Sequence, residues 1–531
     1  MGILSILIFL PLIFGAIILM LPKSLSAYFK YITIAVSLVQ LVIATWLYFQ
    51  FKTSEAFAGV NQLAQYQWVE KLDWIRLDAG SFGTLQIDYL LGLDGFSIGL
   101  VWLSALVMLI AGLSSWEIKT NLKGYFALFL LLNTAIIGVF CALDLFLFYI
   151  FYELMLLPLY FLIGMWGGIR REYAAIKFFL YTLFGSIFML LVIAGLYLSV
   201  IDPETGNHTF NMVTAMNPAN YSAGSIFSTL ANQHIFGFTA RSVGFIVVFI
   251  AFAIKVPVFP FHTWLPDAHV EAPTPISIIL AGILLKVGGY GIIRIAYGIF
   301  PDVAISMSFW IGLLGVISII YGAMNALAQR DLKRLIAYSS VSHMGFVLIG
   351  LASLTPEGVS GAMMQMISHG FLSVMLFFIV GVIYNRVHDR DIYNFRGLAS
   401  QMPIFTGFVM IAFFASLGLP GFSAFIAEAF SLIGAFSSQS LNGLLPRWMA
   451  IIAAFGILLG AGYFLWTLQR MFFGQLRLKK EEWLSQLKDV NIREVITLTP
   501  LAILALVLGI IPSIVFKVTS FSINQFLTLF K

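Results

Sequence analysis

Runs of consecutive apolar residues, each long enough to cross a membrane as a helix, recur along the whole chain. About 20 apolar residues in a helix span the ~30 Å hydrocarbon core of a bilayer. A soluble domain does not fit a composition in which 60% of the 531 residues are hydrophobic and only 10% are charged. Because a helix satisfies its own backbone hydrogen bonds in lipid, the chain is predicted to be an all-α polytopic membrane protein.

We predict about fourteen transmembrane helices, two of them broken. The first run has no basic residue before it and no small-residue cleavage signal, so we expect a retained span and not a signal peptide. The predicted spans are residues 3–21, 31–50, 89–113, 124–141, 143–165, 175–200, 242–264 (broken), 274–299, 303–327, 335–353, 360–385, 404–434 (broken), 449–473 and 495–516.

The positions of lysine and arginine predict the orientation of these spans. With the N-terminus outside, the predicted inner loops carry nineteen of the 29 basic residues and the outer segments, Arg294 included, carry eight. Basic residues favour the inner side of a membrane, so both termini are predicted on the outer, periplasmic side. The two remaining basic residues, Lys255 and Lys286, lie inside predicted spans.

The loops add two expectations. The long outer loops at about 51–88 and 201–241 are polar enough to be ordered caps. The inner segment 476–490 is either a short amphipathic helix at the interface or an ordinary solvated loop, and the pattern does not choose between them.

Proline and glycine interrupt two overlong apolar runs, at Lys255–Pro260 and at Gly418–Gly421. Broken helices at matching positions of two inverted repeats are typical of transport paths. The pattern therefore suggests two five-helix units, residues 124–299 and 300–474, between an N-terminal part (1–123) and a C-terminal part (475–531).

The two intramembrane lysines need a physical reason. A lysine at the centre of a bilayer costs about 2.5–3.5 kcal/mol even on the mildest scale. Lys255 and Lys286 lie well inside their runs, where snorkelling to the interface is difficult. Glu153 is also mid-span and is interpreted as a proton site, a partner of a buried lysine or a structural carboxyl. A lysine whose charge is disfavoured by desolvation can exchange a proton, which favours a proton relay.

Histidines and a second carboxylate extend the series. His343 and His369 fall on adjacent antiparallel spans, and Glu428 follows the second break. Histidine titrates in the range that a relay needs, although a pair of haem ligands or two hydrogen-bonded core residues would show the same pattern. The candidates for proton translocation are Glu153, Lys255, Lys286, His343, His369 and Glu428.

Five further residues are accessory candidates. Asp94, near a span end, fits either a helix cap or a functional carboxylate. His262 and His269 lie in the proline-rich link after Lys255, where their spacing is not that of a zinc site and a wet loop or channel mouth is expected. Asp144 and Lys177 complete this set.

Several kinds of site are excluded by the sequence. With a single cysteine, Cys141, the chain can form no internal disulfide and no all-cysteine metal or iron–sulfur site. It has neither of the glycine-rich phosphate-binding motifs. No cofactor or metal is therefore expected on this chain, and its net charge of +5 does not indicate a nucleic-acid partner.

Six blocks carry a resemblance to a known family. The resemblance spans essentially the whole chain, and the blocks are specific when taken together: Gly92–Ser97, Glu153–Pro158, His262–Thr274, Leu280–Gly291, Asp331–Gly345 and Ala415–Gly421. The chain resembles the antiporter-like membrane subunits of respiratory complex I, and it is most similar to their chain M branch, the counterpart of NADH dehydrogenase chain four. Glu428 favours that branch, because related subunits usually carry lysine there.

The resemblance implies fourteen helices with two inverted five-helix repeats, each containing a broken helix. It implies that Glu153 pairs with Lys255, that Lys286 is the central lysine, and that His343 and His369 bridge to the exchange residue Glu428. The implied function is proton translocation coupled to quinone reduction in other subunits, as part of an NADH-quinone oxidoreductase. A subunit of a sodium/proton antiporter without redox coupling is the alternative.

The resemblance also predicts the surroundings of the chain. The complex as a whole would use NADH, FMN, iron–sulfur clusters and quinone, none of them bound by this chain. Sister antiporter-like subunits on either side and lipid are the expected partners, in a bacterial plasma membrane.

Overall fold

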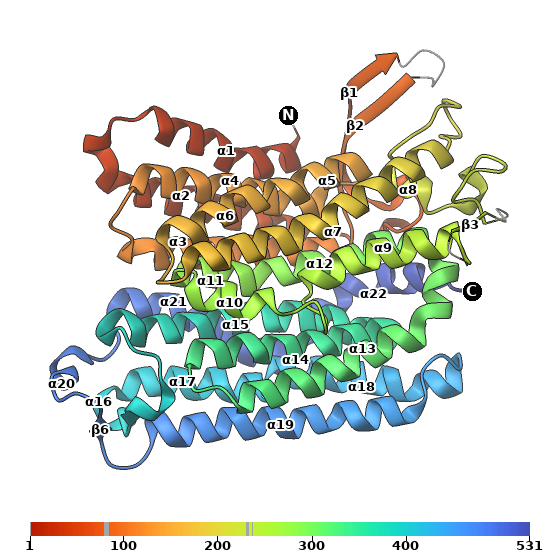
Figure 1. Cartoon of the computed structure of the whole chain (residues 1–531). Coiled ribbons are helices and arrows are strands. Elements are labelled where there is room, and N and C mark those ends of the chain that lie inside the picture. The colour runs from red at the N-terminus through yellow and green to blue at the C-terminus, as the bar shows by residue number, and fades with distance from the viewer. Residues whose placement is uncertain (1, 79–83, 230–232, 236) are drawn as a thin grey trace.

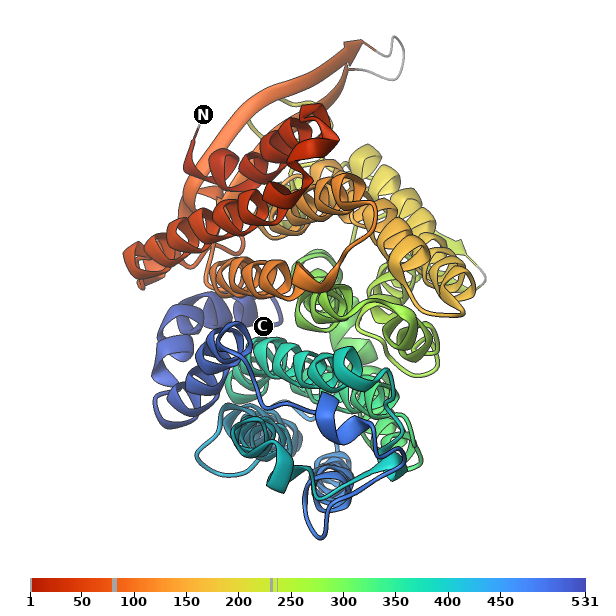
Figure 2. The ribbon, with the colours of Figure 1, turned by 90° about the vertical axis from the view of Figure 1, so that its left-hand side faces the viewer.

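The structure is a computed structural model, and it describes residues 2–78, 84–229, 233–235 and 237–531. The described helices lie side by side along one direction, as Figure 1 shows, and Figure 2 views the bundle from one end. The first half of the helices is α1 Ile3–Met20, α2 Ser26–Gln50, α3 Ser97–Ser114, α4 Leu122–Cys141, α5 Leu145–Leu154, α6 Leu156–Trp166, α7 Arg171–Ser199, α8 Met212–Ala215, α9 Ala240–Lys255, α10 Trp264–Glu271 and α11 Thr274–Ile279. The second half is α12 Leu285–Gly291, α13 Pro301–Leu327, α14 Leu332–Ala352, α15 Pro356–Val387, α16 Leu398–Gln401, α17 Pro403–Ser416, α18 Ser423–Leu441, α19 Arg447–Phe472, α20 Trp483–Gln486, α21 Ile492–Ile510 and α22 Ser513–Thr528.

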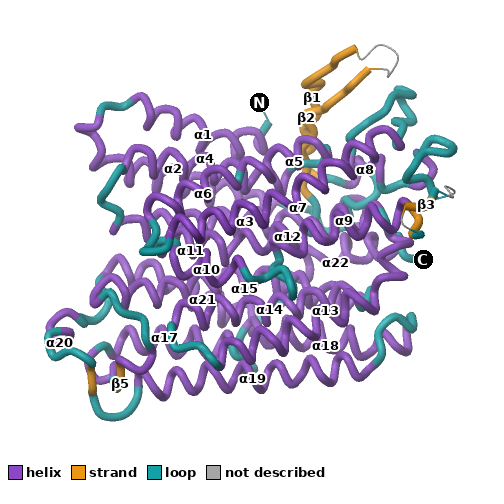
Figure 3. Tube along the Cα trace, viewed as in Figure 1, coloured by secondary structure: helices purple, strands orange, loops and turns teal. Residues whose placement is uncertain are grey.

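Strands form three antiparallel pairs among the described residues, drawn in orange in Figure 3, where the β1–β2 pair is the longest. They are β1 Gln67–Asp78 with β2 Thr84–Leu93, β3 His234–Ile235 with β4 Phe238–Thr239, and β5 Phe395–Arg396 with β6 Arg477–Leu478. Short 3-10 turns lie at Lys23–Leu25, Glu55–Phe57, Leu63–Gln65, Ser115–Glu117, Pro218–Asn220 and Ile392–Asn394.

The predicted all-helical membrane class is confirmed. In the described part of the chain, thirteen helices are long and apolar enough to cross a membrane. The predicted crossing without a counterpart among these thirteen is 242–264, because its break leaves α9 with 16 residues and α10 with eight. The predicted span 404–434 corresponds to α17 and α18, which the second break separates.

The link after Lys255 differs from its prediction. The wet loop expected there is mostly a helix, α10, which begins at Trp264 and buries His269. Pro266 is its third residue, where a missing N–H costs no intrahelical bond. The indole N–H of Trp264 donates to the carbonyl of Ile254 at 2.8 Å, which ties α10 back to the end of α9.

The helix that follows is irregular and central. From Thr274 to Tyr297 it contains two π-helical segments, Leu280–Leu284 and Ile292–Tyr297, on either side of α12. π-segments occur frequently at functional sites because they shift side chains out of the regular helical register. This segment and α15 are buried along their whole apolar windows, so together they form the core of the bundle.

Three other elements depart from the sequence prediction. Residues 89–93, expected to begin a span, lie in β2, and helix α3 begins only at Ser97. A sixteen-residue helix, α22, follows the last predicted span and packs through Phe526 on Phe96, with ring centroids 5.6 Å apart. Segment 476–490 holds strand β6 and the four-residue helix α20, with Trp483 and Leu487 buried, so it is neither a longer amphipathic helix nor an ordinary solvated loop.

The loops predicted to lie inside share one end of the bundle. Gly168 N–H donates to the Glu271 carbonyl at 2.8 Å, and Arg386 reaches the Lys488 carbonyl at 2.9 Å. These contacts join loops that are far apart in sequence, at the left-hand end of Figure 1. The grouping of the loops therefore agrees with the prediction, and the compartment that this end faces stays a prediction.

Candidate functional site

Lys255 ends α9 in the interior, where its side chain is completely buried. Its ammonium group lies 3.2 Å from the centroid of the Tyr152 ring and 3.4 Å from the Tyr152 carbonyl oxygen. A cation over an aromatic face is stabilised by about 2 kcal/mol or more when both groups are desolvated. The ring of Tyr152 and not a carboxylate is therefore the direct partner of this lysine.

Glu153 is adjacent to Tyr152 on α5 and is half-buried. The hydroxyl of Ser186 on α7 lies near its carboxylate, whose charge also interacts with that of Lys255. Among the described residues, no ion pair of 4 Å or less joins Glu153 to Lys255. The carboxylate thus acts on the lysine through space and not through direct contact.

Close packing of α9 and α12 brings the two buried lysines onto neighbouring helices. At Gly288, a Cβ atom would lie 2.8 Å from the backbone nitrogen of Val256 and 2.9 Å from the carbonyl oxygen of Phe252. Only glycine permits this approach, two residues after Lys286. The helix that carries Lys286 is in this way held against the broken end of the helix that carries Lys255.

Lys286 is completely buried in α12, directly after the first π-segment. Its ammonium group donates to the Ala281 carbonyl at 2.5 Å, and it lies 2.8 Å from Nδ1 of His369 on α15. The lysine and the imidazole share one hydrogen bond, so a proton can pass between them along it.

The imidazoles of His369 and His343 are neighbours, as expected from adjacent antiparallel helices. Their ring centroids are 5.5 Å apart, with His343 on α14. Nδ1 of His343 lies 3.2 Å from Oε1 of Glu428 on α18. Both side chains are at least nine-tenths buried, and Nε2 of His343 and Oε2 of Glu428 have no hydrogen-bond partner in the structure.

The second break holds this last carboxylate. Gly418 has φ +77° in the link between α17 and α18, a conformation that a residue with a Cβ atom rarely adopts. A Cβ atom on Gly418 would lie 2.6 Å from Oε2 of Glu428. The break therefore supplies the space in which the Glu428 carboxylate sits.

Together these contacts bring four of the six predicted residues into one buried path across α12, α15, α14 and α18, and a fifth, Lys255, ends the neighbouring helix α9. Lys286, His369, His343 and Glu428 follow one another by contact, and Lys255 approaches through the α9–α12 packing. The sixth, Glu153, borders this path beside Lys255. A buried series of bases that ends in a carboxylate, without a nucleophile at hand, can hold and transfer protons.

Two accessory candidates have structural partners outside this path. Asp94 caps α3 by accepting hydrogen bonds from the N–H groups of Phe96 and Ser97, and it forms an ion pair of 2.6 Å with Arg294. Asp144 caps α5 by accepting from the N–H groups of residues 146 and 147, each at 2.9 Å. Both carboxylates hold helix starts, as the cap interpretation predicts for Asp94.

The other three accessory candidates surround α10. Lys177 of α7 forms an ion pair with Asp267 at 2.7 Å. His269 stacks on Phe377 with ring centroids 4.3 Å apart, and neither of its ring nitrogens has a hydrogen-bond partner. The ring nitrogens of His262 are also unpartnered. Both histidines are buried, so they do not line an open channel mouth as expected.

Comparison with known proteins identifies the family to which the chain belongs. Residues 142–462 match the family described as NADH:quinone oxidoreductase/Mrp antiporter, TM. NADH-quinone oxidoreductase subunit M of Rickettsia conorii is 39% identical over 99% of both chains. The chain belongs to the NADH-quinone oxidoreductase subunit M family. NADH-ubiquinone oxidoreductase chain 4 of Chondrus crispus, 37% identical over 95% of this chain and 93% of its own length, extends that family to its chain 4 counterparts.

The fold agrees with this family. A chain of respiratory complex I from Thermus thermophilus, determined with bound NADH, superimposes with a TM-score of 0.81 at 26% identity. The similarity covers 99% of this chain and 100% of that one. The antiporter-like architecture expected from the six sequence blocks is therefore confirmed.

Lys333 and Arg294 are among the buried cations that the sequence analysis missed. Lys333, assigned to an inner loop, is 4% exposed at the start of α14, where it donates to the Ala272 carbonyl at 2.6 Å. Arg294, assigned to an outer segment, is 2% exposed and pairs with Asp94. Both lie near span ends, where a basic residue usually reaches water, so charge pattern alone did not single them out.

Lys333 lines a cavity of about 270 Å³ at the end of the bundle that holds the predicted inner loops. Glu271, Ala272 and Arg390 also line it, and it reaches the surface at the fully exposed Ile169. The charges of Lys333 and Lys286 both interact with His269. His269 therefore lies within electrostatic reach of both Lys333, which lines this cavity, and Lys286 in the buried path. In the described part of the chain, no group of three or more His, Cys, Asp or Glu side chains has the geometry to hold a metal ion.

Proposed function

We propose that this chain translocates protons across the membrane as a subunit of complex I, coupled to quinone reduction in other subunits. Membership in the subunit M family supports the assignment to the complex. The observation that carries the proton role is the contact series Lys286, His369, His343 and Glu428, buried throughout and joined at 2.8 and 3.2 Å at its two ends. A charged or titratable group within a membrane is costly, so a buried series of such groups points to a function.

In this proposal the series relays protons. Glu153 and Lys255 control the transfer at one end, and Glu428 releases the proton at the other. Protons reach the centre from the cavity at Lys333, pass from Lys286 to His369 and His343, and leave through Glu428. Glu153 sets the charge state of Lys255, which in turn acts on Lys286 across the packed helices α9 and α12. The chain is proposed to lie in a bacterial plasma membrane with both termini outside.

The energy needed to move a proton across the membrane is similar in size to the energy that one neighbouring charge can supply. Moving one charge against 100 mV takes about 2.3 kcal/mol. A unit charge at about 8 Å contributes ~2 kcal/mol at an effective dielectric constant of 20. Gain or loss of one neighbouring charge, such as that of Glu153 beside Lys255, therefore shifts a proton equilibrium by an energy comparable to that of moving the charge across the membrane.

Redox chemistry is proposed to take place elsewhere in the complex. NADH, FMN, iron–sulfur clusters and quinone would be bound by other subunits, and sister antiporter-like subunits would flank this chain. Within the chain, residues 124–299 and 300–474 are proposed as inverted five-helix units, each containing one of the two breaks.

Replacement of Glu153 by Gln in the assembled complex tests the control by Glu153 and Lys255. Proton uptake into membrane vesicles during NADH oxidation is measured with a pH-sensitive dye, and it is expected to fall at least ~10-fold because Lys255 loses its acidic neighbour. Electron transfer from NADH to a soluble acceptor serves as the assembly control and should be unchanged. Proton uptake near the wild-type level in an assembled Glu153→Gln complex would refute the proposal.

A sodium/proton antiporter subunit without redox coupling is the second candidate, because the matching family description also includes Mrp antiporters. Purification from native membranes distinguishes the two. Flavin and iron–sulfur absorbance in the purified assembly supports the complex I assignment, whereas an assembly of antiporter subunits alone supports the second candidate.

A further inference from the structure

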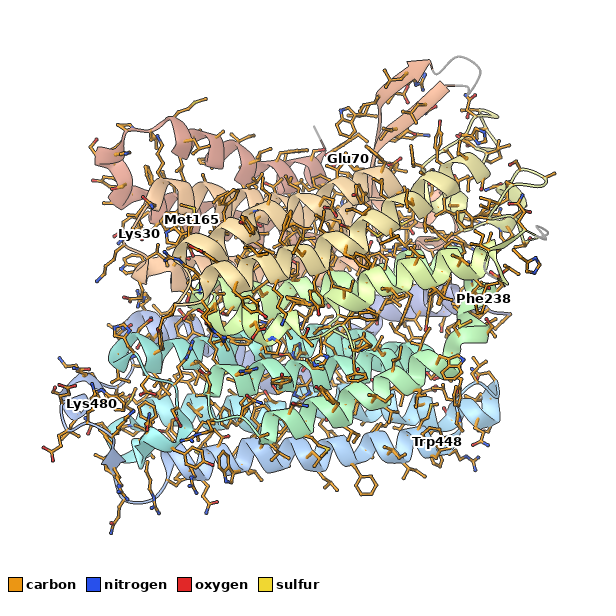
Figure 4. The ribbon with its side chains drawn as sticks, in the orientation of Figure 1. Lys30, Glu70, Met165, Phe238, Trp448 and Lys480 are labelled. Carbon is orange, nitrogen blue, oxygen red and sulfur yellow. The ribbon has the colours of Figure 1, made fainter. Side chains whose placement is uncertain are left out.

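A basic pocket lies at the end of α19, outside the buried path. The cavity of about 470 Å³ is formed where α19 meets the β5–β6 pair, at the lower left of Figure 1. It is at the same end of the bundle as the exposed Lys480, whereas Trp448, at the start of α19, lies near the opposite end (Figure 4). The side chains that define it are Tyr393, Arg396, Trp466, Arg470, Arg477 and Lys479, and we call it the α19 pocket.

Among the residues that the structure describes, the four cations of this pocket have no acidic partner within ion-pair distance. Its lining includes no aspartate or glutamate. In the described part of the chain, the nearby ion pairs join Arg330 to Asp391 and Lys480 to Glu482, and none includes a cation of the pocket. Like charges held this close repel one another, so a bound anion would stabilise the arrangement.

The backbone and two aromatic rings hold the cations in place. Pairing of β5 with β6 sets Arg396 directly opposite Arg477. The guanidinium group of Arg470 lies 4.6 Å from the Tyr393 ring and 5.6 Å from the Trp466 ring. Stacked in this way, Arg470 keeps its N–H groups free of carboxylates, and a guanidinium group matches the oxygens of a phosphate in a two-bond geometry.

One wall of the pocket continues into an exposed apolar strip. Leu465 and Leu458 on α19 are 45% and 67% exposed, and Leu327 on α13 is 39% exposed. Leu327 lies against Gly462, one turn before Trp466, so the strip begins next to the pocket. Tryptophan and tyrosine between charged and apolar surfaces are typical of the membrane–water interface.

From this combination we infer that the α19 pocket binds the phosphate-bearing headgroup of an anionic phospholipid, with the acyl chains lying along the strip on α13 and α19. The four cations recognise the phosphate, and the strip favours a lipid over free inorganic phosphate. Basic pockets on the inner side of membrane proteins bind such headgroups. The inference does not depend on the proposed proton path.

A photo-reactive phosphatidylglycerol tests this inference in the whole complex, reconstituted in phosphatidylcholine nanodiscs. Labelled peptides are identified by mass spectrometry, and we expect labels on the segments around Trp466 and Leu478 that line the pocket. Arg470→Gln combined with Arg477→Gln should reduce this labelling at least ~10-fold, because each arginine contributes charge-assisted hydrogen bonds.

The matched control removes two charges from the same loop but not from the pocket. Lys480→Gln combined with Lys488→Gln changes exposed side chains and should leave labelling within about twofold. Equal loss in both double variants would overturn the inference in favour of general surface charge. Both complexes are compared at equal electron transfer to a soluble acceptor, so that failed assembly is not counted as lost binding.

Two further outcomes would also overturn the inference that the α19 pocket binds a phospholipid. Full competition by inorganic phosphate, at a concentration equal to that of the lipid probe, would assign the pocket to a small anion. Labelling of a neighbouring subunit in place of the α19 pocket would mean that an acidic partner protein occupies it. Competition by unlabelled phosphatidylglycerol but not by phosphatidylcholine is the expected result.

Discussion

The ammonium group of Lys286 lies 2.8 Å from Nδ1 of His369, and its other hydrogen-bond partner is the Ala281 carbonyl. Replacing His369 by Phe keeps a ring of similar size but removes the group that can accept the proton. We expect proton pumping by the assembled complex to fall at least ~10-fold, since a positioned proton-transfer group contributes about 10²–10⁴. Dye-based pumping measured against NADH oxidation checks this.

His388 supplies the control for that prediction. It follows the same helix, α15, is exposed and adopts a left-handed conformation that asparagine also tolerates. His388→Asn should therefore pump normally. Unchanged pumping in His369→Phe would contradict a relay through this imidazole.

Gly418 offers a test of the second break. Gly418→Ala places a methyl group 2.6 Å from Oε2 of Glu428 and requires alanine at φ +77°. The strain costs about 1–2 kcal/mol, and the carboxylate must leave its present position beside His343. Reduced pumping with retained assembly is the expected result of a vesicle assay.

Gly407 on α17 is the matched site. A Cβ atom there would meet nothing within 4 Å, and its φ is not positive, so Gly407→Ala should be silent. If both alanine variants pump equally well, the position of the Glu428 carboxylate does not matter for transport.

The residues of the buried path were predictable because the energetic cost of burying them is visible in the sequence. Lys286, His343 and Glu428 interrupt apolar runs, and a charged or titratable group there calls for partners. The partners themselves depend on tertiary packing. The sequence does not reveal that Lys255 lies over Tyr152, because a side chain adjacent to Glu153 gives no signal of its own.

The helical class followed from hydrophobic length, but local elements near the span ends did not. Pro266 suggested a turn, although a proline in the first turn of a helix is tolerated and α10 begins two residues before it. The β1–β2 hairpin ends in an apolar stretch, Tyr89–Leu93, that reads as the start of a span. Apolar length alone does not distinguish a buried strand from the end of a helix.

The buried ion pair of Asp94 with Arg294 predicts a large effect on stability. Removing one member leaves the other charge buried alone, which costs about 3–5 kcal/mol. Arg294→Met and Asp94→Asn should each lower the thermal midpoint of the purified complex, and the double variant should lose less than the sum of the two. Asn keeps the cap of α3, so Asp94→Ala should cost about 1 kcal/mol more than Asp94→Asn. Strictly additive losses in the double variant would show that the two charges do not stabilise each other.

Lys333 provides the last prediction, on proton uptake from the cavity that it lines. Lys333→Met keeps the length of the side chain and removes its ammonium group, and with it the hydrogen bond to the Ala272 carbonyl. Because a positioned ionisable group speeds proton transfer, we expect the pumping rate to fall about 10-fold or more. The exposed Lys488, at the same end of the bundle, is the control, and Lys488→Met should pump like the wild type. The rate is measured as initial dye quenching per NADH oxidised. A purely structural role for Lys333 would lower both the thermal midpoint and the amount of assembled complex. A role in proton uptake would lower pumping and leave the thermal midpoint and the amount of complex unchanged. Wild-type pumping by Lys333→Met would place proton uptake at another site.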